Sequence, residues 1–226
     1  MDQETLSWMY ENMEENYYAS YEFSPSFYVN ICRAGFIATS CVDTKNKQIL
    51  LPEIQFEYAV LHFKDLHISK KVKALLHKNE FKLTQNQHFE EVLNAIEHYH
   101  KNSWLNNKYT EMLLEIKKNH FENFELASFE LHDTKKGTLV AGEVGYMIGK
   151  TYTSLSGFFQ KEKHYNHWGK LQLVVLSQYL EKNGFDFWNL GHACLLYKID
   201  LGAKVYGRKE FLDLWQRSTS LPQIKL

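Results

Sequence analysis

The distribution of apolar and polar residues along the chain predicts a mixture of strands and helices. In residues 139–159, apolar residues alternate with small or polar ones around Gly142, Gly145 and Gly149, which is typical of two adjacent strands. Residues 170–180 repeat apolar side chains at helical spacing, and a short apolar stretch at 185–188 follows the stop signal Asn183-Gly184. With the helix expected at residues 208–212, this region therefore predicts the order strand, strand, helix, strand, helix.

The same reading of the remaining chain predicts more elements of both kinds. Helices are expected at residues 4–19, 25–34, 70–78, 86–98 and 106–118, and strands at 36–40, 48–51, 57–63, 81–84 and 124–131. Strands and helices are interleaved throughout, which indicates a mixed α+β protein. We expect a small N-terminal α/β layer in residues 1–52 and a larger domain in residues 53–226.

Charge is distributed unevenly along a nearly neutral chain. The 226 residues carry 26 basic and 27 acidic side chains, but the first 32 residues carry six of the acids and no Lys or Arg. The rest of the chain therefore has a net charge of +5. This excess is too small for a general nucleic-acid binder, whose affinity depends on many phosphate contacts, although it leaves room for a local basic patch.

Other features of the sequence bear on location and cofactors. No segment approaches the roughly 20 apolar residues that a membrane span needs, and the acidic N-terminus has no basic region like that of a secretory signal. The three cysteines are odd in number and form no CxxC pair, so we expect free thiols in a reducing compartment. A cytoplasmic monomer that uses no metal, no cofactor and no membrane is the expectation.

A basic helix is the second strong feature. Ser69 caps a predicted helix in which Lys70, Lys71 and Lys73 lie on the polar sides while apolar residues face inward. One interpretation is a solvated surface helix. The other is a helix whose lysines hold an RNA backbone as point charges, without reading its sequence.

Four further residues each have a structural and a functional interpretation. Trp104 is either a core anchor or a platform on which a base stacks. Glu130 is either an exposed acid on an alternating strand or an acid in a cleft, and Glu143 is either exposed at a sheet edge or catalytic. His192 is either a base near neutral pH or a hydrogen-bonded histidine beside the sheet.

In combination, several motifs resemble the leucyl/phenylalanyl-tRNA–protein transferase family. They are Leu-His-Ile-Ser at 66–69 with its basic helix, Trp104-Leu105, Leu-Val-Ala-Gly at 139–142 and Asp-Leu-Gly-Ala at 200–203. The resemblance covers residues 26–216, and this chain is similar to a divergent member. It implies a GNAT-like (acyl-CoA N-acyltransferase-like) mixed sheet flanked by helices.

The resemblance also implies an activity and a set of binding residues. Members of this family move an apolar amino acid of the Leu/Phe/Met class from aminoacyl-tRNA to the N-terminal α-amine of a protein, which tags that protein for degradation as an N-degron. The implied partners are therefore aminoacyl-tRNA and a protein or peptide N-terminus. The tRNA-binding candidates are Lys70, Lys71 and Lys73, and the candidates for the aminoacyl-adenosine pocket are Trp104, Gly142, Phe158 and Trp188.

The chain departs from the family pattern at the catalytic positions. Ser156 stands where the family has its active-site glutamate, and Trp188-Asn189-Leu190 replaces aspartate-cysteine-glutamine. The candidates for a rearranged catalytic set are Ser156, Asn189, His192, Glu143 and Glu130. Two alternatives stay open: a non-catalytic relative that binds tRNA or protein, and another GNAT-type acyltransferase. A coenzyme-A enzyme would need a glycine-rich turn before the central helix, where residues 164–170 have one glycine.

Overall fold

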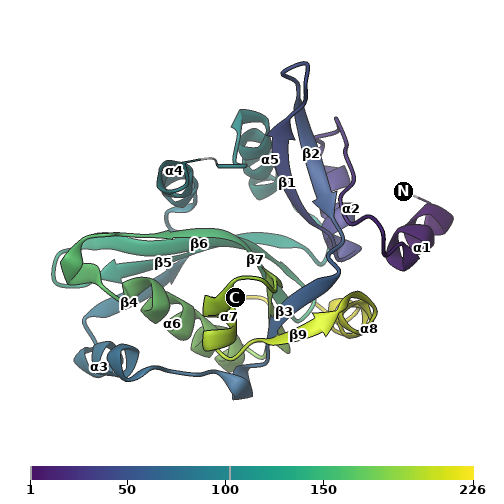
Figure 1. The fold of residues 1–226 in the computed structure, drawn as a ribbon. Helices are drawn as coiled ribbons and strands as arrows, with labels where there is room; N and C mark the ends of the chain where they lie inside the picture. The colour runs from purple at the N-terminus through teal and green to yellow at the C-terminus, as the bar shows by residue number, and fades with distance from the viewer. Residues whose placement is uncertain (1, 102) are drawn as a thin grey trace.

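A seven-stranded mixed sheet forms the centre of the protein (Figure 1). The computed structural model describes residues 2–101 and 103–226. In sheet order the strands are β4 (Phe81–Gln85), β5 (Glu125–Asp133), β6 (Thr138–Ile148), β7 (Thr151–Phe159), β8 (Phe187–His192), β3 (Glu57–Leu61) and β9 (Lys204–Gly207). The expected mixed α+β class is confirmed, and the segments 139–149 and 150–159 lie in one sheet as predicted.

The strands β7 and β8 form a parallel pair in an otherwise antiparallel sheet. Helix α6 (Trp168–Lys182) supplies the crossover connection that a parallel pair requires. The pairing covers only three residues on each strand and ends at Thr153 opposite Asn189. Beyond that point β7 and β8 continue without pairing to each other, so the sheet is open between them. This arrangement fits the expected GNAT-like fold.

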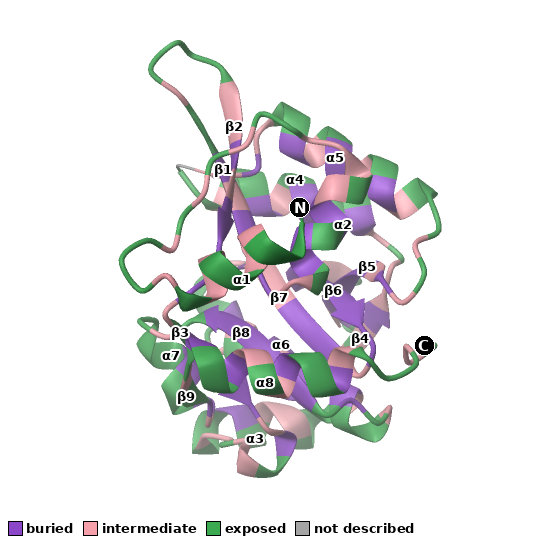
Figure 2. Ribbon diagram, turned by 90° about the vertical axis from the view of Figure 1, so that its right-hand side faces the viewer, coloured by how far each residue is buried: buried purple, intermediate pink, exposed green. Residues whose placement is uncertain are grey.

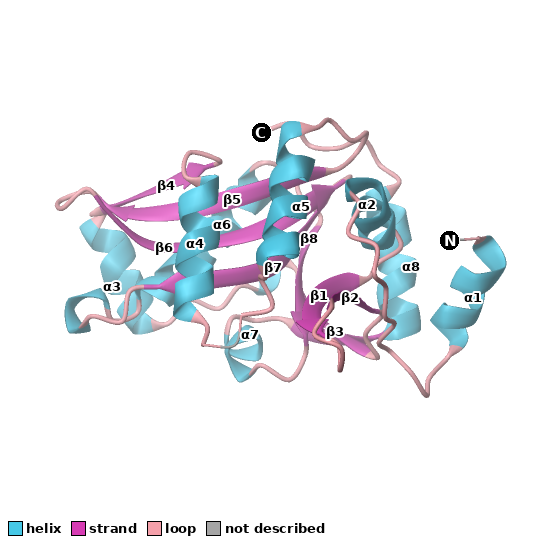
Figure 3. Ribbon diagram, turned by 90° about the horizontal axis from the view of Figure 1, so that it is seen from above, coloured by secondary structure: helices cyan, strands magenta, loops and turns pink. Residues whose placement is uncertain are grey.

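Helices cover both faces of the sheet and bury most of it (Figure 2). Seen from above, α4 (Phe89–Tyr99) and α5 (Asn107–Lys118) lie across one face (Figure 3). Helix α6 packs on the other face, and α3 (Lys70–Lys78) packs against α6. Two separate apolar cores result, one on each face. The C-terminal helix α8 (Arg208–Thr219) contacts β3 and β9.

The N-terminal layer consists of α1 (Gln3–Glu11), α2 (Pro25–Arg33) and the antiparallel strands β1 (Ile37–Val42) and β2 (Gln48–Glu53). Helix α2 begins as its sequence predicts, because the Ser24 hydroxyl accepts from the Phe27 N–H and proline occupies the first turn. The layer shares a core with the α4 face of the large sheet. One link is the Tyr109 hydroxyl of α5, which donates to the carbonyl of Ala38 at 2.7 Å.

The predicted first helix is shorter than expected because tertiary contacts extend the chain after Glu11. Main-chain bridges join Tyr17 to Glu53 and Ser20 to Leu50, so this segment runs beside β2. The buried Arg208 guanidinium donates to the main-chain carbonyls of residues 9, 10, 12, 54 and 55, which ties the arm to the start of α8. Residues 12–20 therefore form an arm against the large domain, and we call them the N-terminal arm.

Two short elements near the C-terminus were not predicted. They are β9 and α7 (Leu196–Asp200), and both are too short to show a clear period in the sequence. The three cysteines are free thiols as expected, with Cys32 buried and the other two exposed. Within the part of the chain that the structure describes, no helix is both long and apolar enough to cross a bilayer.

Candidate functional site

The predicted catalytic residues are divided between the two faces of the sheet. On the α4 face, Ser156 and Phe158 lie on the part of β7 that pairs with β6 but not with β8, and Asn189 lies at the last position where β8 pairs with β7. Glu143 lies on the α6 face, where it contacts Tyr152. The candidates therefore do not form one cluster.

Asn189 shapes the end of β8. Its side-chain oxygen accepts from the Gly191 N–H at 3.0 Å, and its amide donates to the Thr153 hydroxyl at 3.3 Å. Gly191 has a φ of 72°, a left-handed conformation that favours glycine. This turn directs His192 away from β7 and toward the N-terminal layer.

Ser156 has a histidine neighbour on the last turn of α4. The Ser156 Oγ lies 3.4 Å from Nε2 of His100, and the same nitrogen lies 3.1 Å from the carbonyl oxygen of Gly157. A carbonyl only accepts hydrogen bonds, so this nitrogen is the donor to Gly157. His100 in this tautomer therefore does not take a proton from Ser156.

Glu143 is buried in an interior strand, which excludes its interpretation as an exposed edge residue. One of its oxygens accepts from the Tyr152 hydroxyl at 2.8 Å and from the Ser154 hydroxyl at 2.7 Å. Burial raises the pKa of Glu143 to about 7, and the two hydrogen bonds only partly offset that effect. An acid that gains or loses its proton near neutral pH therefore lies beneath the open part of the sheet.

Glu130 is also buried, two strands away from β7. It accepts from the hydroxyls of Thr84 and Ser128, and the His88 N–H at the start of α4 lies 3.5 Å from it. These contacts close the carboxylate off from the open part of the sheet, so the interpretation of Glu130 as an exposed acid is excluded. Glu130 stabilises the N-terminus of α4 through this contact with the His88 N–H.

The aromatic residues and the glycine of the expected pocket have different surroundings. Trp188 is fully buried, and its indole N–H donates to the Ser154 hydroxyl at 2.8 Å. Trp104 is half-buried between α4 and α5, edge-on to Tyr109. A Cβ placed on Gly142 would lie 2.9 Å from the Phe158 ring, so Phe158 takes up the space above that glycine.

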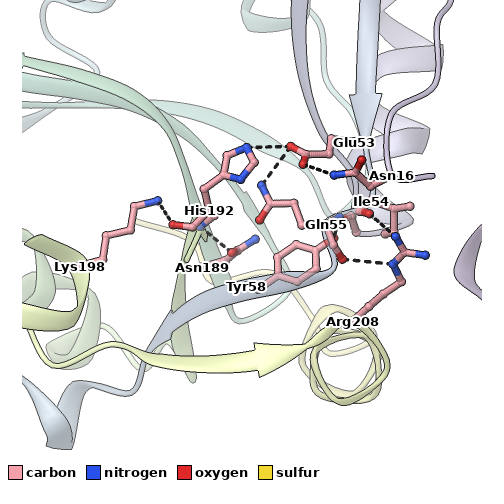
Figure 4. Close-up of polar contacts among 11 residues, drawn as sticks. Asn16, Glu53, Ile54, Gln55, Tyr58, Asn189, His192, Lys198 and Arg208 are labelled. Atoms are coloured by element: carbon pink, nitrogen blue, oxygen red, sulfur yellow. Dashed lines mark hydrogen bonds and ion pairs between the residues drawn. The ribbon is translucent and has the colours of Figure 1, made fainter. Parts of the chain in front are cut away.

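The contact between His192 and Glu53 is the main feature that the sequence did not reveal. The Nε2 atom of His192 lies 2.9 Å from Oε2 of Glu53, with the histidine side chain 47% exposed and the glutamate side chain 4% exposed (Figure 4). Asn16 donates to the other Glu53 oxygen at 2.7 Å, and the Gln55 amide lies 3.4 Å from the first. Glu53 follows Pro52 at the end of a strand, and no motif marks it as functional.

A pocket of about 800 Å³ adjoins the His192–Glu53 pair. It is lined by parts of segments 13–17, 53–57, 192–194 and 207–210, which come from the N-terminal arm, the β2–β3 turn, the end of β8 and the start of α8. Three carboxylates line it, those of Glu53, Glu57 and Glu210. An open pocket with three carboxylates and a half-exposed histidine on its wall is suited to bind a cationic amine and accept its proton.

A buried lysine lies behind the same histidine. Lys198 of α7 is 4% exposed, and its Nζ donates to the main-chain carbonyl of His192 at 2.8 Å. The Cβ position of Gly191 lies 3.8 Å from the Gln55 Nε2 and 3.9 Å from the Lys198 Nζ, so these groups surround the turn. Lys198 is flanked on both sides by apolar residues, which is a local sign in the sequence that its side chain is buried.

The lysines of α3 project from the opposite side of the molecule to α4. Lys70, Lys71 and Lys73 are exposed, and among the described residues none of them forms an ion pair with an acid. Ser69 caps the helix as predicted, with its hydroxyl accepting from the Val72 N–H. The buried Val72 holds this helix to the body of the protein.

The chain is similar to known proteins in sequence and in fold. It is 26% identical over 162 residues to a leucyl/phenylalanyl-tRNA–protein transferase of Flavobacterium johnsoniae, covering 69% of this chain and 70% of that protein. It is also 26% identical over 170 residues to the corresponding enzyme of Maridesulfovibrio salexigens, covering 74% and 67%. Among solved structures, FemX aligns with a TM-score of 0.48 at 10% identity, covering 67% of this chain and 59% of that one.

The sequence profile described as leucyl/phenylalanyl-tRNA protein transferase matches residues 60–216. This match runs from the end of β3 through most of α8 and therefore includes the open part of the sheet between β7 and β8. It leaves out Glu53, which precedes the matched segment. The chain is a transferase that belongs to the leucyl/phenylalanyl-tRNA–protein transferase family.

Proposed function

We propose that this enzyme transfers an apolar amino acid of the Leu/Phe/Met class from aminoacyl-tRNA to the N-terminal α-amine of a protein. The observation that carries the proposal is the His192–Glu53 pair, placed at the open end of β8 and on the wall of a pocket. Ser156 occupies the position where the family has its active-site glutamate, so another group must accept the proton of the acceptor amine. His192 is the base in this proposal.

The chemistry requires a neutral amine and little other activation. The ester that links the amino acid to tRNA is already reactive, so positioning and proton transfer are the main tasks. Glu53 fixes the N–H of His192 on Nε2, which leaves Nδ1 free to take a proton. The acceptor nitrogen attacks the ester carbonyl, an amide bond forms, the ester bond breaks, and the 3′ oxygen of tRNA leaves with the proton.

The pocket supports an acceptor with a cationic N-terminal residue. Its carboxylates attract an α-ammonium and a positively charged side chain. The buried Arg208 on its wall does not oppose this charge fully, because main-chain carbonyls already accept its hydrogen bonds. Lys209 pairs with Asp213 on α8. We therefore propose Lys or Arg, rather than Asp or Glu, as the acceptor N-terminal residue.

The donor would approach from the α4 face in this account. Trp104 and Phe158 supply apolar surface there, which suits both an apolar side chain and a stacked adenine. The exposed lysines of α3, which make no ion pair among the described residues, lie on the other side of the sheet, so in this proposal they meet phosphates where the tRNA passes around the sheet. Addition of such an amino acid would tag the acceptor for degradation as an N-degron, in the cytoplasm where charged tRNA is found.

Two other functions make different demands. A non-catalytic relative that binds tRNA or protein would not need the His192–Glu53 pair, so the pair favours the enzyme. A coenzyme-A acyltransferase would bind pyrophosphate at the start of α6. That helix begins after His167, whose side chain makes no capping hydrogen bond, and its first turn contains the bulky Trp168.

The test is a transfer assay with labelled leucyl-, phenylalanyl- and methionyl-tRNA. Peptides that differ only in an N-terminal Lys, Arg, Asp or Glu serve as acceptors, and the same peptides with an acetylated N-terminus serve as controls. We expect label on the Lys and Arg peptides and none on acetylated ones. If no charged tRNA labels any peptide while tRNA or peptide binding persists, the non-catalytic function is correct.

A further inference from the structure

Lys198 is a buried cation without an acidic partner among the described residues. Its Nζ makes one hydrogen bond to protein, to the His192 carbonyl. Its neighbours on α7 and the preceding turn are apolar and exposed, with Leu196 at 80%. Because the chain turns Lys198 inward while leaving leucines in solvent, burial of apolar surface does not account for this arrangement.

The groups that face the amine are few. On its own loop Cys194 is the titratable group that interacts with the amine, and from the β2–β3 turn the neutral Gln55 amide lies near Gly191. The Glu53 carboxylate interacts with the ring of His192 and not with Lys198. Burial lowers the pKa of Lys198 to about 8, so the amine is largely charged at neutral pH and neutral in mild alkali.

Such a residue destabilises the fold. A buried cation without a counter-ion loses its hydration, and one hydrogen bond to a carbonyl does not replace it. An apolar side chain of similar length, such as methionine, would fill the same space at lower free energy. Strain of this kind is often found where a residue serves the reaction.

Resting on the proposed function, we propose that Lys198 is a positioning residue of the transfer reaction. Its ammonium group fixes the main chain of His192, so that the imidazole meets Glu53 and Nδ1 stays free. It also places positive charge behind the open end of β8, where the ester oxygen becomes negative as the amine attacks. Lys198 does not touch the substrates, and its effect is exerted through His192 and through its charge.

The test compares the pH profiles of kcat in three proteins. In the wild type, kcat rises as the acceptor amine loses its proton and then falls as Lys198 loses its charge near pH 8. Lys198→Arg keeps the charge at all these pH values, so its alkaline fall should move up by more than one pH unit. Lys198→Met should lower kcat about 10- to 100-fold at pH 7 with the acceptor KM unchanged, and should raise the thermal midpoint.

Lys170→Met is the matched control. Lys170 is an exposed lysine of α6 that pairs with Asp200 of α7, the helix that also carries Lys198. The Lys170→Met substitution should leave the pH profile of kcat unchanged. A Lys198→Met enzyme with wild-type kcat and an unchanged alkaline limb would overturn the proposal. An Arg variant whose alkaline limb stays in place would overturn the role of the charge.

A second readout separates this proposal from the proposed function. The NMR signals of the His192 ring should shift in Lys198→Met and stay in place in Lys170→Met, whether or not transfer occurs. If the wild type transfers nothing but these signals shift, the proposed function fails while the link from Lys198 to His192 holds. If transfer occurs and the signals do not move, Lys198 does not position His192.

Discussion

The His192 imidazole and the Glu53 carboxylate, 2.9 Å apart, join the end of β8 to the end of β2. Glu53 therefore lies at the expected boundary between the N-terminal layer and the large domain. Its other oxygen binds Asn16 of the N-terminal arm, so three parts of the chain meet at one carboxylate. This geometry gives the N-terminal layer a place in the site, beyond support of the sheet.

The buried Glu143 makes the stability of the protein dependent on pH. Its folded-state pKa of about 7 lies above the ordinary value, so between pH 4.5 and 7 the folded state binds more protons than the unfolded state. Stability therefore falls as pH rises through that window. At pH 8, urea denaturation should show a free energy of unfolding roughly 3 kcal/mol higher for Glu143→Gln than for the wild type. Near pH 4.5 the two proteins should have similar free energies of unfolding.

Transfer activity gives an independent check on Glu143. The residue lies on the α6 face, away from the His192–Glu53 pair, so the Gln variant should keep kcat within a few-fold of the wild type. A large loss of kcat in a folded Glu143→Gln protein would make Glu143 catalytic. A stability difference that does not change with pH would contradict its buried titration.

The exposed lysines of α3 should contribute a salt-dependent part of tRNA binding. Replacing Lys70, Lys71 and Lys73 together by Ala should weaken binding and reduce the slope of log K against log salt by about 2 to 3. Binding of charged tRNA measured between 50 and 200 mM salt checks this. The control changes the same total charge elsewhere, at Lys45, Lys118 and Lys182. Equal slopes in the α3 variant and the wild type would exclude α3 as the RNA surface.

Trp104 should matter for the donor and not for the acceptor. Because base stacking on an aromatic ring contributes about 1–3 kcal/mol, Trp104→Ala should raise the KM for charged tRNA about 10-fold or more. The KM for the acceptor peptide should not change. Trp8→Ala is the control, since Trp8 is 55% exposed on α1. If Trp104→Ala has a normal KM for charged tRNA and thermal unfolding shows that it is folded, Trp104 is not part of the donor pocket.

The sheet could be predicted because apolar residues alternate with small or polar ones within its strands, and this alternation is visible in the local sequence. Within residues 139–159 apolar residues alternate with small or polar ones around glycines, and these residues form the interior strands β6 and β7. The strand predicted at 185–188 extends instead to His192, because Ala59 and Tyr58 of β3 pair with its last two residues. Such pairing comes from a distant strand, so the local pattern of residues could not indicate it.

The site could be predicted only in part, for a similar reason. His192 was a candidate because a histidine side chain can act as a base near neutral pH. Its partner Glu53 is distant in sequence and follows an ordinary strand, so only the fold brings the two together. Apolar residues flank Lys198 in the sequence, but the sequence does not show whether its side chain points inward or into solvent. The orientation of α7 in the fold buries it.

The most direct test of the central claim is kcat for transfer from charged leucyl-tRNA to an N-terminal Lys peptide. Wild type, His192→Ala, His192→Gln and Glu53→Gln are compared at pH 7, with circular dichroism and thermal unfolding to verify folding. We expect both His192 variants to lose about 100-fold or more in kcat, Glu53→Gln to lose about 10-fold or more, and the donor KM to stay constant. Folded His192 variants that transfer at the wild-type rate would contradict the account.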